Sequence, residues 1–216
     1  MEEKIKAIVL KQSDNGENNL VLTLATHRGV IDVLAKGVKK MAAKNRAACQ
    51  SFVLADYLLA YTSENSRGVL TSGSVISDFG IISNLEAIAV MSVITDVISR
   101  HFKNINFFAD LIDLLNCYRD NENPWPDFCW LVYQWIDISG IKPEVNYCHE
   151  CLDTQIVGFS LSGGFVCRNC LNNYDLILDK EKLKLIYYLL KSSRKDKSKL
   201  RLLSYDWLIA ELLVKY

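Results

Sequence analysis

Over the first 80 residues, apolar and polar residues alternate in short segments, a pattern typical of strands with one buried face. In Asn19–Ala25, for example, Leu20, Leu22 and Leu24 fall on one face. The segments predicted to form strands are Lys4–Lys11, Asn19–Ala25, Val30–Ala35, Phe52–Tyr61 and Val69–Ile76. Five short strands separated by turn residues favour a small barrel over a parallel sheet with crossover helices. An amphipathic helix over Val53–Tyr61 is the competing local interpretation.

At about Ser83 the period of the apolar residues changes to that of a helix. The run from Ser83 to Glu86 matches a capping box, in which the Ser83 hydroxyl accepts from an unpaired N–H and Glu86 reaches back to the cap. The residues predicted to form the buried stripe of this helix are Leu85, Ile88, Ala89, Val93, Val97 and Ile98. Further helices are predicted at Phe107–Tyr118, Phe128–Ser139, Asp179–Leu190 and Tyr205–Lys215. The chain is therefore predicted to be α+β, with a barrel domain at 1–80 and a helical domain at 81–216.

Four cysteines interrupt the helical part as two closely spaced pairs. Cys148-x₂-Cys151 is followed, after fifteen residues, by Cys167-x₂-Cys170. Two residues between thiolates let both bind one ion from a tight turn, and the second pair completes a tetrahedron of four sulfurs. Disulfides are the alternative, but the odd total of seven cysteines and an intracellular setting argue against them. We predict one bound zinc ion.

This zinc site is predicted to be structural. A catalytic zinc keeps a coordination position open for water, whereas four cysteines fill the shell. The adjacent His149 and Glu150 do not match the His-x-Glu of nucleobase deaminases, and we expect His149 to face solvent. The Gly163-Gly164 pair predicts a hairpin turn within the same segment.

The sequence contains none of the common catalytic or phosphate-binding motifs that we sought: no GxxxxGK[ST], GxGxxG, GxSxG or HExxH. The remaining cysteines, Cys49, Cys117 and Cys129, lie in apolar or helical segments and are expected to be buried. We therefore predict that the protein is not an enzyme.

Composition places the chain among ordinary globular proteins, with 50% hydrophobic residues. The apolar runs are shorter than the roughly 18 residues that span a bilayer, and Met1-Glu2-Glu3-Lys4 lacks the layout of a signal peptide. We expect a cytoplasmic protein without membrane contact.

The net charge of zero conceals an uneven distribution. An acidic stretch runs from Asp110 to Asp127, with Arg119 its only base, and a basic run extends from Lys191 to Arg201. A second basic segment follows the third predicted strand and contains no acid; its cations are Lys36, Lys39, Lys40, Lys44 and Arg46. Small barrels of this kind bind single strands through a positive groove with aromatic platforms. We predict that this segment contacts nucleic acid, although a solvated surface loop is the alternative.

Aromatic residues add little to this prediction. Tyr57 and Tyr61 lie in the predicted barrel and are candidate stacking platforms. Trp125, Trp130 and Trp135 are spaced as core residues of a helix.

Taken together, these features resemble the RecO family of bacterial recombination mediators. The resemblance rests on "LAKGVKK" after the third strand and on "GIKPEVNYCHEC" and "GFSLSGGFVCRNC" around the cysteines. It extends from about Lys4 to Cys170 and is strongest over Gly140–Cys170. It implies an OB-fold domain, then a helical domain with an inserted zinc ribbon at about 144–175. Where many relatives carry a more polar, proline-containing loop, this chain has Met41-Ala42-Ala43.

The resemblance also implies a function. Members bind single- and double-stranded DNA, anneal complementary strands and help RecA to load onto strands coated by single-stranded-DNA-binding protein (SSB). Their partners are RecR and SSB, and their expected location is the bacterial cytoplasm, at the nucleoid. The competing hypothesis from the residues alone is a zinc-ribbon adaptor that joins proteins without contacting DNA.

Overall fold

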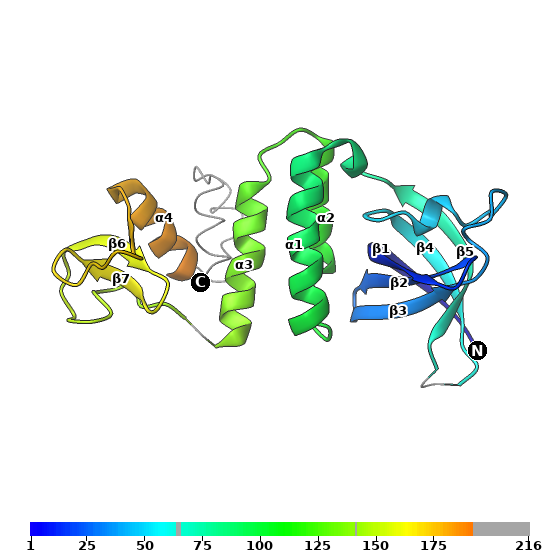
Figure 1. The fold of residues 1–216 in the computed structure, drawn as a ribbon, viewed down its shortest axis with the longest axis horizontal. Coiled ribbons are helices and arrows are strands. Elements are labelled where there is room, and N and C mark those ends of the chain that lie inside the picture. The colour runs from blue at the N-terminus through cyan, green and yellow to red at the C-terminus, as the bar shows by residue number, and fades with distance from the viewer. Residues whose placement is uncertain (64–65, 141, 192–216) are drawn as a thin grey trace. The chain divides into compact units, whose positions relative to one another are not determined.

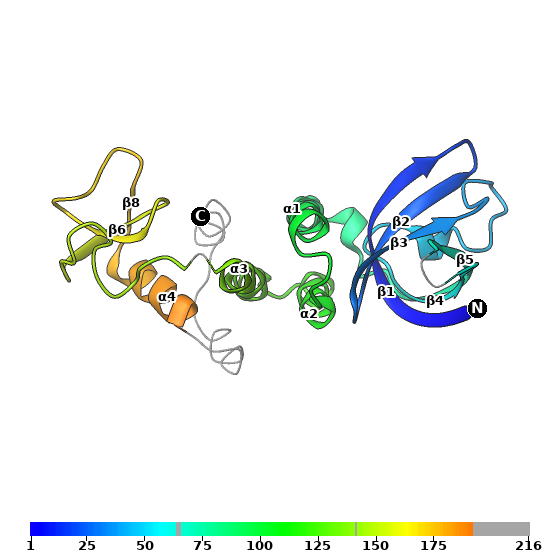
Figure 2. The ribbon, with the colours of Figure 1, turned by 90° about the horizontal axis from the view of Figure 1, so that it is seen from below.

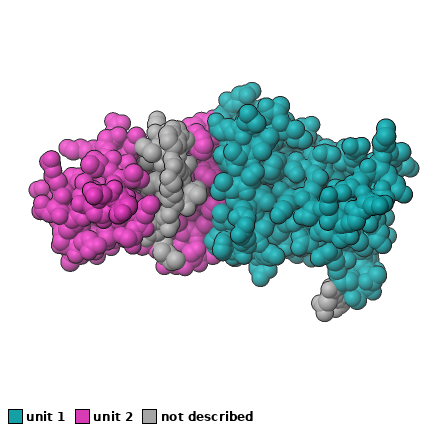
Figure 3. Space-filling model, viewed as in Figure 1, with its two compact units in different colours: residues 1–122 teal, residues 123–216 magenta. Residues whose placement is uncertain are grey.

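Strands and helices follow one another along the chain largely as the sequence predicts. The computed structural model describes residues 1–63, 66–140 and 142–191. Its residues group into two compact units, 1–122 and 123–216 (Figure 3). The change from strands to helices falls near residue 80, and a folding domain that ends there stays a prediction.

Five strands of the first unit close into a barrel in the order β1-β2-β3-β5-β4 (Figures 1 and 2). They are β1 (Glu2–Asn15), β2 (Asn19–Thr26), β3 (Gly29–Ala35), β4 (Leu54–Ala60) and β5 (Gly68–Ser77). Neighbouring strands are antiparallel except β3 and β5, which are parallel. This is the predicted OB-fold barrel.

Side chains that alternate along the strands fill the barrel. Leu22, Leu24 and Leu59 are fully buried, as the strict period of two requires. The alternative helix over Val53–Tyr61 is wrong, because Ala55, Tyr57 and Leu59 face the core while the residues between them are partly exposed.

The first helix of this unit, α1 (Leu85–His101), is capped by Asn84, one residue after the predicted cap. The side-chain oxygen of Asn84 accepts from the N–H of Ala87 at 3.1 Å. Ser83 instead ends a short 3₁₀ helix, η2 (Ile81–Ser83), and donates its hydroxyl to the Gly80 carbonyl at 2.8 Å. The predicted capping box is therefore wrong: Asn84 caps α1 alone, because the residue three positions later is Ala87, whose side chain cannot reach back to the cap.

The buried stripe of α1 also differs from the prediction. Its buried residues are Ala87, Val90, Met91, Ile94, Thr95 and Ile98. The predicted stripe began at Leu85 and passed through Val93, which are 85% and 40% exposed. Apolar residues occur on several sides of this helix, so periodicity alone could not select the face. The Thr95 hydroxyl donates to the Leu10 carbonyl of β1 at 3.4 Å. Packing against the barrel therefore selects which face of α1 is buried.

The turn between β2 and β3 joins the barrel to the segment after α1. The N–H of Val30 donates to the carbonyl of Lys103 at 2.7 Å. Gly29, with φ of +110°, makes this approach possible, since a Cβ there would lie 2.4 Å from the same carbonyl oxygen. The helix α2 (Phe108–Arg119) follows and lies beside α1 (Figures 1 and 2).

The second unit contains α3 (Trp125–Ser139), a three-stranded sheet and α4 (Lys180–Lys191). Pro124 precedes α3, which therefore starts three residues earlier than predicted. Gly140, with φ of +72°, ends the helix. The sheet has the order β7-β6-β8, from β6 (Ile156–Ser160), β7 (Gly164–Cys167) and β8 (Leu176–Ile177). Its β6–β7 hairpin turns at the predicted glycine pair. The helix predicted at Tyr205–Lys215 lies outside the described residues.

No helix in the described ranges is both long and apolar enough to cross a membrane.

We predict that Gly29→Ala lowers the free energy of unfolding by roughly 3 kcal/mol, because the new Cβ is strained at positive φ and also meets the Lys103 carbonyl. Gly16→Ala is the matched control: its φ is +71°, but nothing lies within 4 Å of its Cβ position. The control should lose only about 1 kcal/mol. Urea unfolding of both variants measures the difference. Equal losses would contradict the close approach.

Candidate functional sites: a cysteine cluster and a basic connector

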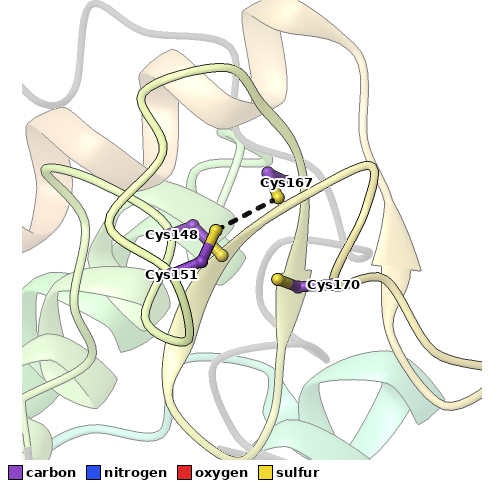
Figure 4. Close-up of side chains that lie close together, drawn as sticks. All are labelled: Cys148, Cys151, Cys167 and Cys170. Atoms are coloured by element: carbon purple, nitrogen blue, oxygen red, sulfur yellow. Dashed lines mark hydrogen bonds between the residues drawn. The ribbon is translucent and has the colours of Figure 1, made fainter.

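The four paired cysteines come together in the second unit (Figure 4). Their sulfur atoms all lie within 4.8 Å of one another, and the cluster could hold a metal ion. Cys148 and Cys151 come from the turn before β6, Cys167 ends β7, and Cys170 lies in the turn that follows. Among the described residues, no other group of three or more His, Cys, Asp or Glu side chains gathers in this way.

The two turns have the same backbone arrangement. The carbonyl of Cys148 accepts from the N–H of Leu152 at 2.9 Å, and the carbonyl of Cys167 accepts from that of Leu171 at 3.1 Å. In each turn the second cysteine is thereby folded back toward the first. The N–H of His149 donates to the carbonyl of Phe165 at 2.9 Å, which joins the first turn to β7.

Sulfur spacing distinguishes this cluster from a disulfide. Cys151 and Cys167 have their sulfurs 3.6 Å apart, far beyond the roughly 2.05 Å of a covalent bond. Four sulfurs at about 2.3 Å from a tetrahedral zinc ion lie about 3.8 Å from one another. The spacing is therefore close to that of a tetrahedral shell of four sulfurs, and such a shell would leave no position for a catalytic water.

The local electrostatics also suit a cation. Burial opposes ionisation of Cys148, but N–H groups of Cys167, Cys151 and Glu150 direct their dipoles at its sulfur and lower its pKa to about 6. The pKa of the Cys170 thiol is raised, first by its hydrogen bond with Cys151 and then by burial. A divalent cation would reverse this second shift, because it stabilises all four thiolates together.

The prediction that His149 faces solvent is wrong. Its side chain is 13% exposed and lies over the hairpin, where a Cβ on Gly163 would stand 2.3 Å from its Nδ1. The imidazole thus packs the first cysteine turn against the β6–β7 turn. The prediction failed because the sequence does not indicate that the His149 imidazole packs against Gly163, fourteen residues later in the chain.

The second site is the connector 36–46 between β3 and β4, which carries the five predicted cations and no acid. Lys36, Lys40, Lys44 and Arg46 are exposed. Lys39 differs, because it is only partly exposed and its ammonium pairs with Asp14 of β1 at 2.6 Å. Four of the five cations therefore extend from the connector into solvent.

Buried and hydrogen-bonded residues hold the connector in place. Val38 is 3% exposed and joins the barrel core. The N–H of Gly37 donates to the side chain of Asn19 at 2.8 Å. The Asn45 side chain contacts β5 twice, accepting from the N–H of Gly73 at 3.2 Å and donating to the carbonyl of Thr71 at 3.3 Å. The connector thus follows the barrel surface with its cations directed outward. Sequence reasoning missed Asn19 and Asn45, because an asparagine in a turn carries no sign of its distant partner.

Tyr57 is not a stacking platform. It is fully buried, and its hydroxyl donates to the carbonyl of Ala48 at 2.6 Å. Tyr61 is partly buried and packs against the barrel core. The aromatic part of the predicted nucleic-acid site is therefore wrong at Tyr57.

The three remaining cysteines are buried, as predicted. Cys49, Cys117 and Cys129 are at most 4% exposed. Burial raises the pKa of Cys49 to about 11, so this thiol is unreactive at neutral pH.

Comparison with known proteins assigns the family. The family description "Recombination protein O N terminal" matches residues 1–79, which include the barrel. A DNA repair protein RecO of Bacillus velezensis is 31% identical over 176 residues, covering 77% of this chain and 68% of the relative. The chain belongs to the RecO family.

Other RecO proteins align over similar lengths. The one from Shouchella clausii is 31% identical and covers 80% of this chain and 70% of its own. The one from Halalkalibacterium halodurans is 28% identical and covers 87% and 78%. Membership of the RecO family supports a role in DNA repair and recombination. A solved aspartyl tRNA synthetase from Entamoeba histolytica aligns at 14% identity over 75% of this chain and 39% of its own, with a TM-score of 0.28, too low to support any conclusion.

Proposed function

We propose that this RecO-family protein is a non-catalytic DNA-binding mediator that binds and anneals strands and helps RecA to load onto SSB-coated single strands. The observation that carries the proposal is the connector 36–46, which presents four exposed cations and no acid beside an OB-fold barrel. Phosphate contacts by such side chains release counterions and give affinity without sequence preference.

The anchored backbone of the connector strengthens this proposal. Because Val38 and Asn45 are held against the barrel, the exposed lysines start from a fixed base, and less chain entropy is lost when DNA binds. Lys39 is assigned a smaller share, since binding a phosphate would compete with its ion pair to Asp14.

The cysteine cluster is assigned a structural zinc ion. Cys148, Cys151, Cys167 and Cys170 would hold it, and the ion would supply folding free energy where the buried apolar cluster around the cysteines is small. It takes no part in binding DNA in this proposal.

For the connector, we predict that the double variant Lys40→Gln, Lys44→Gln binds single-stranded DNA more weakly and with a shallower salt dependence. Two lost phosphate contacts should reduce the slope of log K against log salt by about 1.4. Fluorescence anisotropy with a labelled oligothymidine across a salt series measures it. Lys39→Gln should change the slope less than Lys40→Gln alone or Lys44→Gln alone.

The matched control is Lys103→Gln with Lys180→Gln, which removes two exposed positive charges outside the connector. Its slope should equal that of the natural protein. If the slope of log K against log salt falls by the same amount in the control and in the connector variant, the cations act only through net charge. The connector assignment then fails.

For the metal, we predict about one zinc ion per freshly reduced chain, detected by elemental analysis. Cys148→Ser should lower the zinc content and the melting temperature, because metal binding is coupled to folding of the ribbon. Cys117→Ala, which removes a buried thiol outside the cluster, should leave the zinc content unchanged whatever its effect on stability. A zinc content near zero in the natural protein would refute the assignment.

Annealing distinguishes the mediator from the alternative adaptor. Complementary SSB-coated strands should anneal faster with the protein, with and without RecR, and high salt should suppress this effect. An adaptor that only joins proteins would bind RecR or SSB yet anneal no strands at low salt.

A further inference from the structure

A surface pocket of about 680 Å³ lies in the first unit, next to the end of the basic connector. Its walls are a stretch of β1 around Lys11, the chain from Gln50 to Phe52, and the outer side of α1. The Gln50 amide donates to the carbonyl of Arg46, the last cation of the connector, at 3.4 Å. The pocket therefore borders the surface that is proposed to bind phosphates.

Irregular backbone on two sides forms this pocket. β1 has a bulge between Val9 and Lys11, and the Leu10 carbonyl at the bulge accepts from the hydroxyl of Thr95 in α1. Phe52 has a φ of +65°, which is rare for an aromatic residue. Its N–H donates to the carbonyl of Val9 at 2.6 Å, which holds the turn against the bulge. Because the bulge, the turn and the helix are bonded to one another, the pocket is already formed before a ligand binds.

The lining combines amide groups with apolar surface. Gln12 and Gln50 are partly buried, and each uses its amide nitrogen in a hydrogen bond of 3.4 Å to a neighbouring residue. Their amide oxygens accept no hydrogen bond from any described residue. Ile82 and Ile88 supply the apolar part of the wall. A nucleobase has the same two parts, an apolar face and an edge of donors and acceptors.

The charge of the pocket suits a nucleotide. Lys11 is exposed on the wall and forms no ion pair with a described residue. Arg100 and Asp96, which also line the pocket, neutralise each other through an ion pair of 2.6 Å. One positive charge remains, and the exposed Arg46 adds a second beside Gln50. A strand that places a base here therefore has cations available for its phosphates.

We propose that this pocket receives one unstacked base of the DNA strand whose phosphates the connector binds. The inference rests on the proposed function, since it extends the same single-strand site from the phosphates to a base. The hydrogen bonds of Gln12 and Gln50 are long and therefore weak, so each amide can rotate to offer a donor or an acceptor. The pocket would thus accept any base, in agreement with binding that has no sequence preference.

Two other occupants fit less well. The wall includes a single carboxylate, that of Asp96, and this carboxylate is already paired, so a metal ion lacks oxygen ligands of the usual kind. An aliphatic side chain of a partner protein would cover Gln12 and Gln50 without giving their amide oxygens a donor, which is costly.

The test compares two strands of about 20 nucleotides, oligothymidine and an abasic strand of equal length. Both carry the same phosphates, and they differ only in their bases. Fluorescence anisotropy with the full chain across a salt series gives an affinity and a salt slope for each. Oligothymidine should bind about tenfold more tightly with a similar slope, because a base contact adds affinity without releasing counterions.

Gln50→Ala should weaken oligothymidine binding about fivefold and leave binding of the abasic strand and both salt slopes unchanged, since it removes a base contact and no charge. Ser92→Phe should have the same effect, because it adds an aromatic ring to the pocket wall. Val93→Phe is the matched control. Val93 is exposed on the same helix and does not line the pocket, so this variant should bind both strands as the natural protein does.

Photocrosslinking locates the base. Trypsin cleaves after Arg46 and Arg67, so one peptide, 47–67, contains the turn that lines the pocket. A strand with 5-iodouracil in place of thymine should crosslink to this peptide, as mass spectrometry would show. The yield should fall in Ser92→Phe and stay unchanged in Val93→Phe.

Equal binding of oligothymidine and the abasic strand by the natural protein would overturn the base pocket and leave the connector assignment intact. Equal weakening of both strands in Gln50→Ala would also overturn it, as would an effect of Val93→Phe as large as that of Ser92→Phe. Failure of the proposed function has a different signature: neither strand would bind at low salt, and both assignments would then be wrong.

Discussion

Two residue pairs close the barrel, and the position of the basic connector depends on them. Val33 and Leu34 of β3 pair with Gly68 and Val69 of β5, and these are the parallel contacts of the barrel. Because β3 is thereby bordered by β5, β4 must pair on the far side, with β1 and β5. The chain between β3 and β4 then has to cross from one side of the barrel to the other, and a connection of this length can carry side chains that no hairpin would present.

The same crossing explains the mixed composition of the connector. Val38 joins the barrel core, as do Ala48 and Cys49 just after the connector, while the four exposed cations between them stay in solvent. Tyr57, which was predicted as a candidate base-stacking platform, instead holds the chain just after the connector through its hydrogen bond to the Ala48 carbonyl. The Tyr57 side chain, although aromatic, is therefore part of the barrel core and does not contact DNA in this proposal.

Around the four cysteines of the second unit, little apolar packing is available. The buried cluster around them contains little more than Cys148, Val166 and Cys167, with a few partly buried neighbours. Phe159 and Phe165 of the same sheet are buried but do not belong to this cluster, so the small apolar core is a property of the cysteine site and not of the whole sheet. The paired turns, in which the carbonyls of Cys148 and Cys167 accept backbone hydrogen bonds, place the sulfurs so that an ion can serve as the core of the ribbon.

The sequence by itself determined the features that depend on local pattern. Strict alternation around Leu22 and Leu24 identified strands, Gly140 ended α3, and the spacing of Cys148, Cys151, Cys167 and Cys170 predicted a cluster, because neighbours in sequence dictate each of these. Only the tertiary structure decided which face of α1 is buried and that Lys39 pairs with Asp14. Those outcomes arise from contacts between residues far apart in the chain, and no local period or motif encodes them.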